Sequence, residues 1–318
     1  MTLTNILGVK VVTVTLNPVL DKSLWVKGFE AGGTFQVERS ESVAGGKGVN
    51  VSRALRTMGF DSIATGFMAE VGSAPYIQLM NRDRLVSDFL MTGGTLRMNI
   101  TVISEGQKSE THLREQGPVL PESLFLELEK KLKKHFSEGA FFVCAGSLPG
   151  GLPSDSYARI IEKVVSWGGR AFLDASGQPL LEGLKAGPFF IKPNAHEVTE
   201  ALGFSPETRE DLLQAVEQFH GMGIESVMIT LGSRGLLLSR GGEAVWASVT
   251  VQRPVNSVGS GDASLAGGIA GLLSGLSVSD TARLACAMGG ANTLVSGACV
   301  FRREEVLRLV QEAHIRPL

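Results

Sequence analysis

The chain has 318 residues, of which 43% are hydrophobic, and it carries a formal net charge of −2. It can bury a large core, but its charge provides no bulk attraction to nucleic acid or to an anionic membrane, so we expect neither partner. The three cysteines, Cys144, Cys286 and Cys299, are far apart and odd in number, which argues against a disulfide framework or a zinc site and favours the cytoplasm.

The N-terminal part is expected to begin with a strand over residues 11–16, which Pro18 ends. Asp21 is expected in the loop that follows, where its carboxylate would accept hydrogen bonds from substrate hydroxyls. The alternative for Asp21 is an ordinary turn residue.

Two glycine-rich stretches without helical period, at about 23–43 and 94–113, predict β-ribbons that form a small sheet over the ligand edge. We interpret this sheet as a lid and as a possible homodimer surface, the alternative being surface hairpins with no moving role. Alternation in the second ribbon places Arg97 and Asn99 on one face, which would close on a phosphate.

Between the ribbons, Gly45, Gly46 and Lys47 lead into a helix expected over 48–58, which contains Asn50. Adjacent glycines suggest that the backbone approaches a ligand closely. The pattern matches neither GxxxxGK[ST] nor GxGxxG, so it favours a polar ligand more than a nucleotide.

From about residue 120 onward, short apolar runs alternate with amphipathic stretches, which predicts a doubly wound parallel α/β sheet. The expected strands are 140–144, 170–174, 189–191 and 226–230, and the expected helices are 121–136, 154–166, 194–202 and 208–222. Polar residues follow these strands and should meet at the carboxyl edge of the sheet. They include Ser147, Asp174, Lys192, Asn194 and Gly232.

Asn194 and Glu197 begin one of these helices, and Glu197 would reach a magnesium ion through water. Their spacing also fits a plain capping box, which is the stronger interpretation on spacing alone. Thr230, Gly232 and Gly235 close the last strand and suit either nucleotide phosphates or a hairpin.

The run Gly259-Ser260-Gly261-Asp262 precedes a helix of small residues and has the layout of a phosphoryl-transfer site. Its N–H groups would surround an anion, and Asp262 would take the proton from an attacking hydroxyl. The helix dipole should keep Asp262 ionised. The alternative is a turn in which Asp262 only caps the helix.

Taken in order, six segments resemble the phosphofructokinase-B branch of the ribokinase-like sugar kinases, most closely its 1-phosphofructokinase and tagatose-6-phosphate kinase members. The matching residues are 15–18 with Asp21, 45–50, 146–149, 192–194 with Glu197, 231–232 with Gly235, and 258–262. The resemblance implies a single kinase domain over residues 1–318, with a three-layer α/β/α core, a β-lid, ATP as donor and Mg²⁺ as cofactor.

The same resemblance implies residue roles. Asp262 would be the catalytic base, with the N–H groups of Gly259, Ser260 and Gly261 as the anion hole. The sugar would be held by Asp21, Gly45, Gly46, Lys47, Asn50, Arg97, Asn99 and Ser147. Asn194 and Glu197 would order the metal, and the nucleotide would be held by Lys192, Asn194, Thr230, Gly232, Gly235 and Asn292.

The acceptor is expected to be a ketohexose phosphate: fructose 1-phosphate first, tagatose 6-phosphate second and fructose 6-phosphate third. A non-catalytic sugar-phosphate sensor on a kinase fold remains open, although an intact Asp262 argues against it. A nicotinamide-dependent dehydrogenase is disfavoured, because no GxGxxG follows the first strand.

Overall fold

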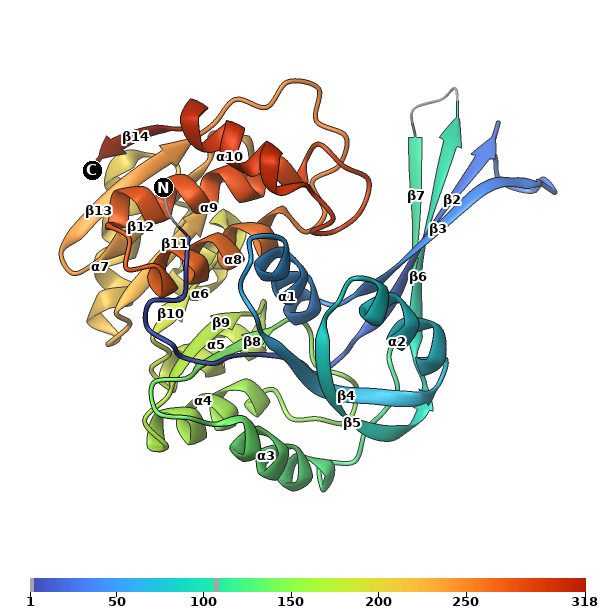
Figure 1. Ribbon diagram of the computed structural model, residues 1–318, viewed down its shortest axis with the longest axis horizontal. Coiled ribbons are helices and arrows are strands. Elements are labelled where there is room, and N and C mark those ends of the chain that lie inside the picture. The colour runs from blue at the N-terminus through green and yellow to red at the C-terminus, as the bar shows by residue number, and fades with distance from the viewer. Residues whose placement is uncertain (1–2, 106–108) are drawn as a thin grey trace.

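A large central sheet organises the computed structural model, which describes residues 3–105 and 109–318 (Figure 1). Its ten strands are β1 (Val11–Thr15), β4 (Ile63–Val71), β5 (Val86–Thr95), β8 (Phe141–Ala145), β9 (Arg170–Asp174), β10 (Phe190–Ile191), β11 (Ser226–Thr230), β12 (Leu236–Arg240), β13 (Glu243–Ser248) and β14 (His314–Pro317). They lie in the order β14-β13-β12-β11-β10-β9-β8-β1-β4-β5. All pairs from β11 to β5 are parallel, and β12 to β14 add antiparallel strands. The predicted doubly wound α/β sheet is confirmed.

Side chains at alternate positions of the central strands pack into two separate hydrophobic cores, one on each face of the sheet. In β8, Phe141 and Val143 join one core, whereas Phe142 and Cys144 join the other. Every residue of β1 and β8 is buried, because helices cover both faces.

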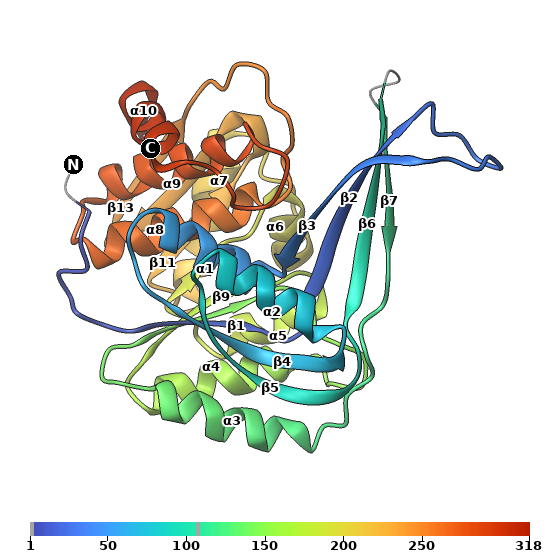
Figure 2. The ribbon, with the colours of Figure 1, turned by 45° about the vertical axis from the view of Figure 1, so that its right-hand side comes forward.

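Ten helices surround the large sheet in the described part of the chain. They are α1 (Lys47–Thr57), α2 (Ser73–Arg82), α3 (Leu124–His135), α4 (Ser156–Ser166), α5 (Gln178–Lys185), α6 (Ala195–Leu202), α7 (Arg209–Gly221), α8 (Ser260–Leu273), α9 (Val278–Asn292) and α10 (Arg303–Glu312). The core on one face contains residues of α1, α8, α9 and α10, and the core on the other face contains residues of α3 to α7. This gives the three layers seen in Figures 1 and 2.

Helices α8 and α9 pack against each other with very little space between their backbones. A Cβ at Gly267 would lie 2.5 Å from the Cα of Ala285, so only glycine fits there. This packing explains the run of small residues in α8, and it fixes the start of α8 near the middle of the sheet.

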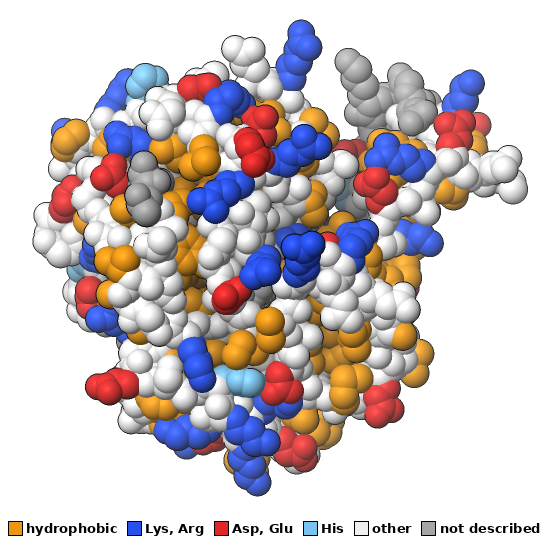
Figure 3. Space-filling view, in the orientation of Figure 1, with side chains coloured by type: hydrophobic (Ala, Val, Ile, Leu, Met, Phe, Trp, Pro, Cys, Tyr) orange, Lys and Arg blue, Asp and Glu red, His pale blue; other side chains and the backbone are white. Residues whose placement is uncertain are grey.

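A second, four-stranded sheet projects from the body as an arm (Figures 2 and 3). Its strands are β2 (Val19–Lys27), β3 (Val37–Gly45), β6 (Arg97–Glu105) and β7 (Ser109–Arg114), in the order β3-β2-β6-β7. Strands β2 and β6 pair in parallel at its centre, and the outer pairs are antiparallel. We call it the small sheet. In Figure 3, basic and acidic side chains are interspersed over this face of the molecule.

Most predicted elements match the structure to within a few residues at their ends, but two details are wrong. Asp21 lies inside β2 and not in a loop, because the chain turns at Pro18 and resumes as a strand at once. Gly94 belongs to β5 of the large sheet, so the second ribbon starts later, at Arg97. Residues 106–108 of that ribbon lie outside the described residues.

The three cysteines are buried, as expected, and none forms a disulfide. Burial raises the pKa of the Cys286 thiol to about 12, so this group stays protonated at neutral pH. Among the described helices, none combines the length and apolar character required to cross a membrane.

Candidate phosphoryl-transfer site

The loop before α8 is shaped so that the backbone wraps around the helix start. Gly259 has φ of +85°, and a Cβ there would lie 2.7 Å from the Cβ of Ala298. The N–H groups of the first helical turn have no partner within the helix, so the start of α8 is suited to an anion. This is where Gly259, Ser260 and Gly261 were expected to bind phosphate.

Asn292, at the end of α9, holds this loop in place. Its Nδ2 donates to the carbonyl of Val258 at 2.8 Å and to Ser260 Oγ at 3.0 Å, and its Oδ1 accepts from the N–H of Cys299 at 2.7 Å. These contacts join two loops through one buried amide. They favour a supporting role for Asn292 over the direct nucleotide contact expected from the sequence.

Asp262 lies in the first turn of α8 and is only 6% exposed. Its Oδ2 accepts a hydrogen bond of 2.8 Å from Nδ2 of Asn50 on α1. Burial, followed by the charge of Asp174, raises the pKa of Asp262 to about 6, although Lys47, Asn50 and Lys192 oppose the shift. Desolvation therefore outweighs the helix dipole in the pKa, although the expectation that Asp262 stays ionised still holds at neutral pH. Asp262 is a stronger base than an ordinary carboxylate and is still mostly ionised at pH 7.

Two lysines meet at Asp174, the last residue of β9, whose carboxylate is fully buried. Asp174 Oδ1 lies 2.9 Å from Lys47 Nζ and 3.3 Å from Lys192 Nζ. Burial alone would raise the pKa of Asp174, but the charges of Lys192 and Lys47 outweigh it and lower the pKa. A Cβ at Gly261 would lie 3.1 Å from Lys192 Nζ, so this ammonium group sits directly against the anion-binding turn.

The sugar-binding residues expected at the start of α1 are brought to the same place by tight turns. Gly46 caps α1 with φ of +116°, and a Cβ there would lie 2.7 Å from Cγ2 of Thr15. Lys47 and Asn50 are then one helical turn apart, which directs Lys47 to Asp174 and Asn50 to Asp262.

Asp21 is placed against the backbone where the small sheet joins the body. A Cβ at Gly45 would lie 2.0 Å from Asp21 Oδ2, so the position requires glycine. Asn99 Nδ2 donates to Asp21 Oδ1 at 2.9 Å. Burial raises the pKa of Asp21 despite this bond and the nearby charge of Arg97.

Arg97 and Ser147 both contact Asn17, in the turn between β1 and β2. Arg97 Nη2 donates to the carbonyl of Asn17 at 2.8 Å, and Asn17 Nδ2 donates to Ser147 Oγ at 3.3 Å. Arg97 Nε, Asn17 Oδ1 and Asn99 Oδ1 are buried without a protein partner. Buried polar groups of this kind are normally satisfied, which points to a polar ligand or water at this place.

Asn194 and Glu197 form a complete capping box at the start of α6, which confirms the plainer interpretation of their spacing. The Asn194 N–H donates to Glu197 Oε2 at 2.8 Å, and the Glu197 N–H donates to Asn194 Oδ1 at 2.9 Å. Burial raises the pKa of Glu197. A cap does not exclude a metal role, because Mg²⁺ is commonly held by one or two carboxylates, waters and substrate phosphates.

The nucleotide-binding residues expected on β11 lie beside this cap. Thr230 and Asn194 form an isolated parallel β-bridge, and the N–H of Thr230 donates to the carbonyl of Pro193 at 3.0 Å. Gly232 begins the short 3-10 helix η1 (Gly232–Arg234), and Gly235 ends it with φ of +97°. These two glycines lie one turn beyond Thr230 and contact neither Asp262 nor Asp174 among the described interactions.

Three residues of the site were not among the predicted site residues. Asp174 had been noted only as the end of a strand at the ligand edge, which was its one signal. Asn17 lies within a recognised motif and Arg53 lies three residues after one, but their contacts are with residues distant in sequence. Such partners are set by the fold and cannot be read from spacing.

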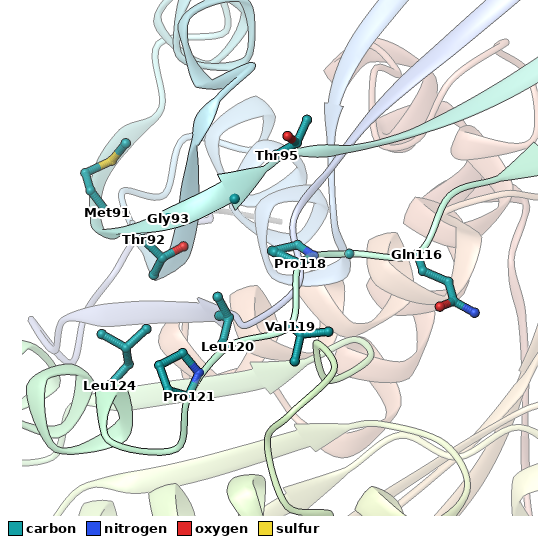
Figure 4. Close-up of a pocket in the computed structure, with 12 residues that line it drawn as sticks. Met91, Thr92, Gly93, Thr95, Gln116, Pro118, Val119, Leu120, Pro121 and Leu124 are labelled. Atoms are coloured by element: carbon teal, nitrogen blue, oxygen red, sulfur yellow. The ribbon is translucent and has the colours of Figure 1, made fainter.

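A cavity of about 650 Å³ lies next to this site, between β5 and the segment 116–124 (Figure 4). Its lining residues are all neutral: Met91, Thr92, Gly93, Gly94, Thr95, Gln116, Gly117, Pro118, Val119, Leu120, Pro121 and Leu124. It adjoins Asn17 at Gly117, where a Cβ would lie 2.2 Å from Asn17 Oδ1. A lining without cations does not suit phosphate, whereas the region around Asp262 contains two lysines.

Comparison with known proteins agrees with this geometry. Residues 13–304 match the model of the pfkB family of carbohydrate kinases. The 1-phosphofructokinase of Bacillus subtilis is 32% identical over 279 residues, which cover 88% of this chain and 91% of that protein. The tagatose-6-phosphate kinase of Staphylococcus epidermidis is 32% identical over 287 residues, which cover 89% and 92%.

Solved structures show the same fold at lower identity. Phosphofructokinase-2 from Escherichia coli has a TM-score of 0.90 at 23% identity and covers 95% of this chain and 98% of that one. Ribokinase from Arabidopsis thaliana has a TM-score of 0.73 at 21% identity, with 95% and 98% covered. The ribokinase-like fold predicted from the motifs is therefore confirmed.

Proposed function

This chain belongs to the pfkB family of carbohydrate kinases, and from this premise we propose that it transfers the γ-phosphoryl group of ATP to a ketohexose phosphate, fructose 1-phosphate before others. Tagatose 6-phosphate is the second candidate acceptor and fructose 6-phosphate the third. The observation that carries the proposal is the buried Asp262 at an anion-binding helix start, with two lysines beside it. Membership of a carbohydrate kinase family argues against the dehydrogenase alternative, and the intact, buried Asp262 argues against the sensor.

Asp262 acts as the general base in this proposal. The acceptor hydroxyl lies between the Asp262 carboxylate and the γ-phosphorus, and Asp262 takes the proton as the oxygen attacks. A pKa of about 6 suits this step, since the group is ionised at neutral pH yet has appreciable proton affinity. General bases of this type contribute about 10²–10⁴ in rate.

Charge on the transferring phosphoryl group is stabilised from the side opposite the base. The transition state is loose and spreads charge over the phosphoryl oxygens, so catalysis relies on positioning and on preorganised donors. The N–H groups of Gly259 and Gly261 supply such donors, and that of Ser260 joins them if it leaves the carbonyl of Ser257, to which it donates at 3.1 Å. Lys192 adds a buried positive charge against Gly261. In this proposal Lys192 therefore lies between the nucleotide and the phosphoryl group that is transferred.

The phosphate already present on the sugar is bound by Arg97, with Lys47 as a second cation. Burial lowers the pKa of Arg97, but an arginine remains fully charged at neutral pH. Asp21 and Asn99 bind sugar hydroxyls, with Ser147 close by through Asn17. A neutral sugar has no use for two cations, which favours a sugar phosphate as the acceptor.

Magnesium would be held by Glu197 and Asn194 through water, in agreement with their oxygen donors at the start of α6. Among the described residues there is no cluster of three metal-binding side chains, which fits an ion carried mainly by the nucleotide phosphates. When bound, Mg²⁺ neutralises charge between the β- and γ-phosphates. Thr230, Gly232 and Gly235 would lie along the nucleotide.

The small sheet acts as a lid in this proposal. Asp21, Gly45, Arg97 and Asn99 all lie at its base, so its position controls both closure and sugar binding. A lid that excludes water would also suppress hydrolysis of ATP. The exposed strands of this arm are the natural surface for a homodimer, which light scattering after gel filtration would test. The free, buried cysteines support a reducing, cytoplasmic location.

Steady-state assays of ADP release with Mg-ATP test the proposal directly. We expect kcat/KM to be highest for fructose 1-phosphate, lower for tagatose 6-phosphate and lowest for fructose 6-phosphate. Arg97→Met should raise the KM for the preferred sugar phosphate about 10- to 100-fold, since it removes a charged hydrogen bond. Arg56→Met, on the exposed side of α1, is the matched control. A free sugar used better than all three phosphates would refute the substrate class.

A further inference from the structure

A buried arginine on α1 ties four parts of the chain together next to the site. Arg53 is 4% exposed, and its Nε lies 2.8 Å from Asp83 Oδ2, just after α2. Its Nη2 donates to the carbonyl of Ala44 in β3 at 2.6 Å, and its Nη1 donates to the carbonyl of Ala298 at 3.3 Å. Nη1 also donates to Oδ1 of Asn50, one turn earlier on the same helix, at 3.1 Å.

The contact with Asn50 determines which way that amide faces. Asn50 lies between Arg53 and Asp262, and its Nδ2 is 2.8 Å from Asp262 Oδ2. A guanidinium group has only donors, whereas an ionised carboxylate has only acceptors. The oxygen of Asn50 must therefore face Arg53, and its NH₂ group must face Asp262.

We propose that Arg53 is a positioning residue for phosphoryl transfer: it fixes the Asn50 amide so that it donates to Asp262 and holds that carboxylate in the ionised form that accepts the proton. This inference rests on the proposed function, because it requires Asp262 to be the base. Arg53 contacts neither the sugar phosphate nor the nucleotide in this account, and its effect on the ionisation of Asp262 passes through Asn50.

Three other groups that face Asp262 have no contact with Arg53: Lys47 on α1, Lys192 after β10 and Asp174 at the end of β9. Cys299, in the loop after α9, also lies near Asp262 and follows Ala298, to which Arg53 donates, but burial keeps its thiol protonated, so it adds no charge. Asp174 holds both lysines, so loss of Arg53 leaves that arrangement in place. Without Arg53 the Asn50 amide is free to turn, and its carbonyl oxygen would then face the carboxylate. The ionised form of Asp262 loses a donor, and its pKa rises.

The pH dependence of kcat/KM measures this effect, and a structural role alone would not move it. Arg53→Met alone would leave the half-buried Asp83 carboxylate without its main partner, so the test variant is the double substitution Arg53→Met with Asp83→Asn. The acid limb is the part of the profile in which kcat/KM falls as the pH is lowered. We expect its midpoint to lie about one pH unit higher in the double variant, because a hydrogen bond to a charged group is lost. At pH 6, kcat/KM should be about fivefold lower than in the wild type, and at pH 5 about tenfold lower.

Arg56→Met is the matched control, since Arg56 follows Arg53 by three residues on α1 and pairs with Asp61 at the surface. Its profile should coincide with that of the wild type. The phosphate of the substrate also titrates near pH 6, but it contributes equally to every profile. Differences between the pH profiles of the variants therefore reflect the ionisation of groups on the protein.

An acid limb that stays in place, or moves down, in a folded double variant would overturn the proposal, even if the variant melts at a lower temperature. If the double variant does not fold, Arg53→Lys decides, because lysine keeps the charge for Asp83 but cannot also hold Asn50. It should shift the limb upward as well, and an unshifted limb would overturn the proposal. If Asp262→Ala retained turnover, Asp262 would not be the base and the proposed function would be contradicted. If Asp262→Ala were inactive but the Arg53 variant showed an unshifted acid limb, only the positioning role of Arg53 would be contradicted.

Discussion

Replacing Asp174 by asparagine removes the charge that holds two lysines at the site while keeping the side-chain volume. The carboxylate is buried, and its Oδ1 lies 2.9 Å from Lys47 Nζ and 3.3 Å from Lys192 Nζ. In Asp174→Asn the two ammonium groups face each other without the carboxylate between them. We expect both the stability of the protein and its pH-rate profile to change.

Breaking a buried ion pair by removing one partner costs about 3–5 kcal/mol of unfolding free energy. Lys47 is 37% exposed and is screened by water, so we expect the lower end, about 3 kcal/mol, in urea denaturation at pH 7. The pKa of Asp174 is lowered in the folded protein, so its contribution is present above the unfolded pKa and is lost as pH falls through the folded value. The difference from wild type should therefore shrink below about pH 4.

The pH dependence of kcat/KM in Asp174→Asn should shift in the direction opposite to that of the Arg53 variant. The charge of Asp174 helps to raise the pKa of Asp262, so its removal lowers that pKa below about 6. The acid limb of kcat/KM should move to lower pH. Turnover at pH 7 should fall by about tenfold or more, because Lys192 is no longer fixed.

Asp88→Asn is the matched control, because Asp88 also lies between two basic side chains, Lys131 and His135, but on the far side of the sheet from Asp262. Its side chain is 42% exposed, so we expect a loss below about 1 kcal/mol and unchanged turnover. An Asp174→Asn protein as stable as wild type with an unshifted acid limb would refute the reasoning, as would an equal loss in Asp88→Asn.

Other substitutions test single contacts. Gly45→Ala should displace Asp21 and lower kcat/KM about 10²-fold, and a normal KM for the sugar would contradict the close approach. Glu197→Gln should raise the Mg²⁺ concentration for half-maximal turnover about tenfold while the helix cap survives; an unchanged Mg²⁺ requirement would argue against the metal role. Asn292→Ala should cost about 1–3 kcal/mol of stability and lower kcat, because the loop before α8 loses its anchor; a reduced affinity for ATP alone would restore the direct role.

The alternation of buried strands and amphipathic helices allowed much of the fold to be predicted from sequence. Strand 226–230, for example, is observed at the expected residues, because its short apolar centre, Val227 to Ile229, lies between helical patterns and is typical of a buried strand. Asp21 was misplaced because proline ends one strand without preventing the next from starting immediately. The small sheet was underestimated for the same reason, since its first strand begins at Val19.

The order of the motifs predicted Asp262 and the glycines before it as site residues, but the sequence did not predict the pKa of Asp262. The helix dipole is a local property and is visible in sequence, whereas burial is a property of the whole fold. Burial has the largest effect on the pKa of Asp262 and raises it, an effect that the local sequence does not show. Asp174 and Arg53 escaped prediction because their roles depend on contacts with Lys192 and Asn50 that only the folded chain brings together.

The central claim is that Asp262 is the base of a sugar-phosphate kinase. It is tested most directly by single-turnover phosphorylation of fructose 1-phosphate by the wild type and Asp262→Ala, with both substrate dissociation constants measured in parallel. We expect the rate to fall by about 10²–10⁴ while binding is largely kept. A variant that phosphorylates the sugar at the wild-type rate would contradict the account.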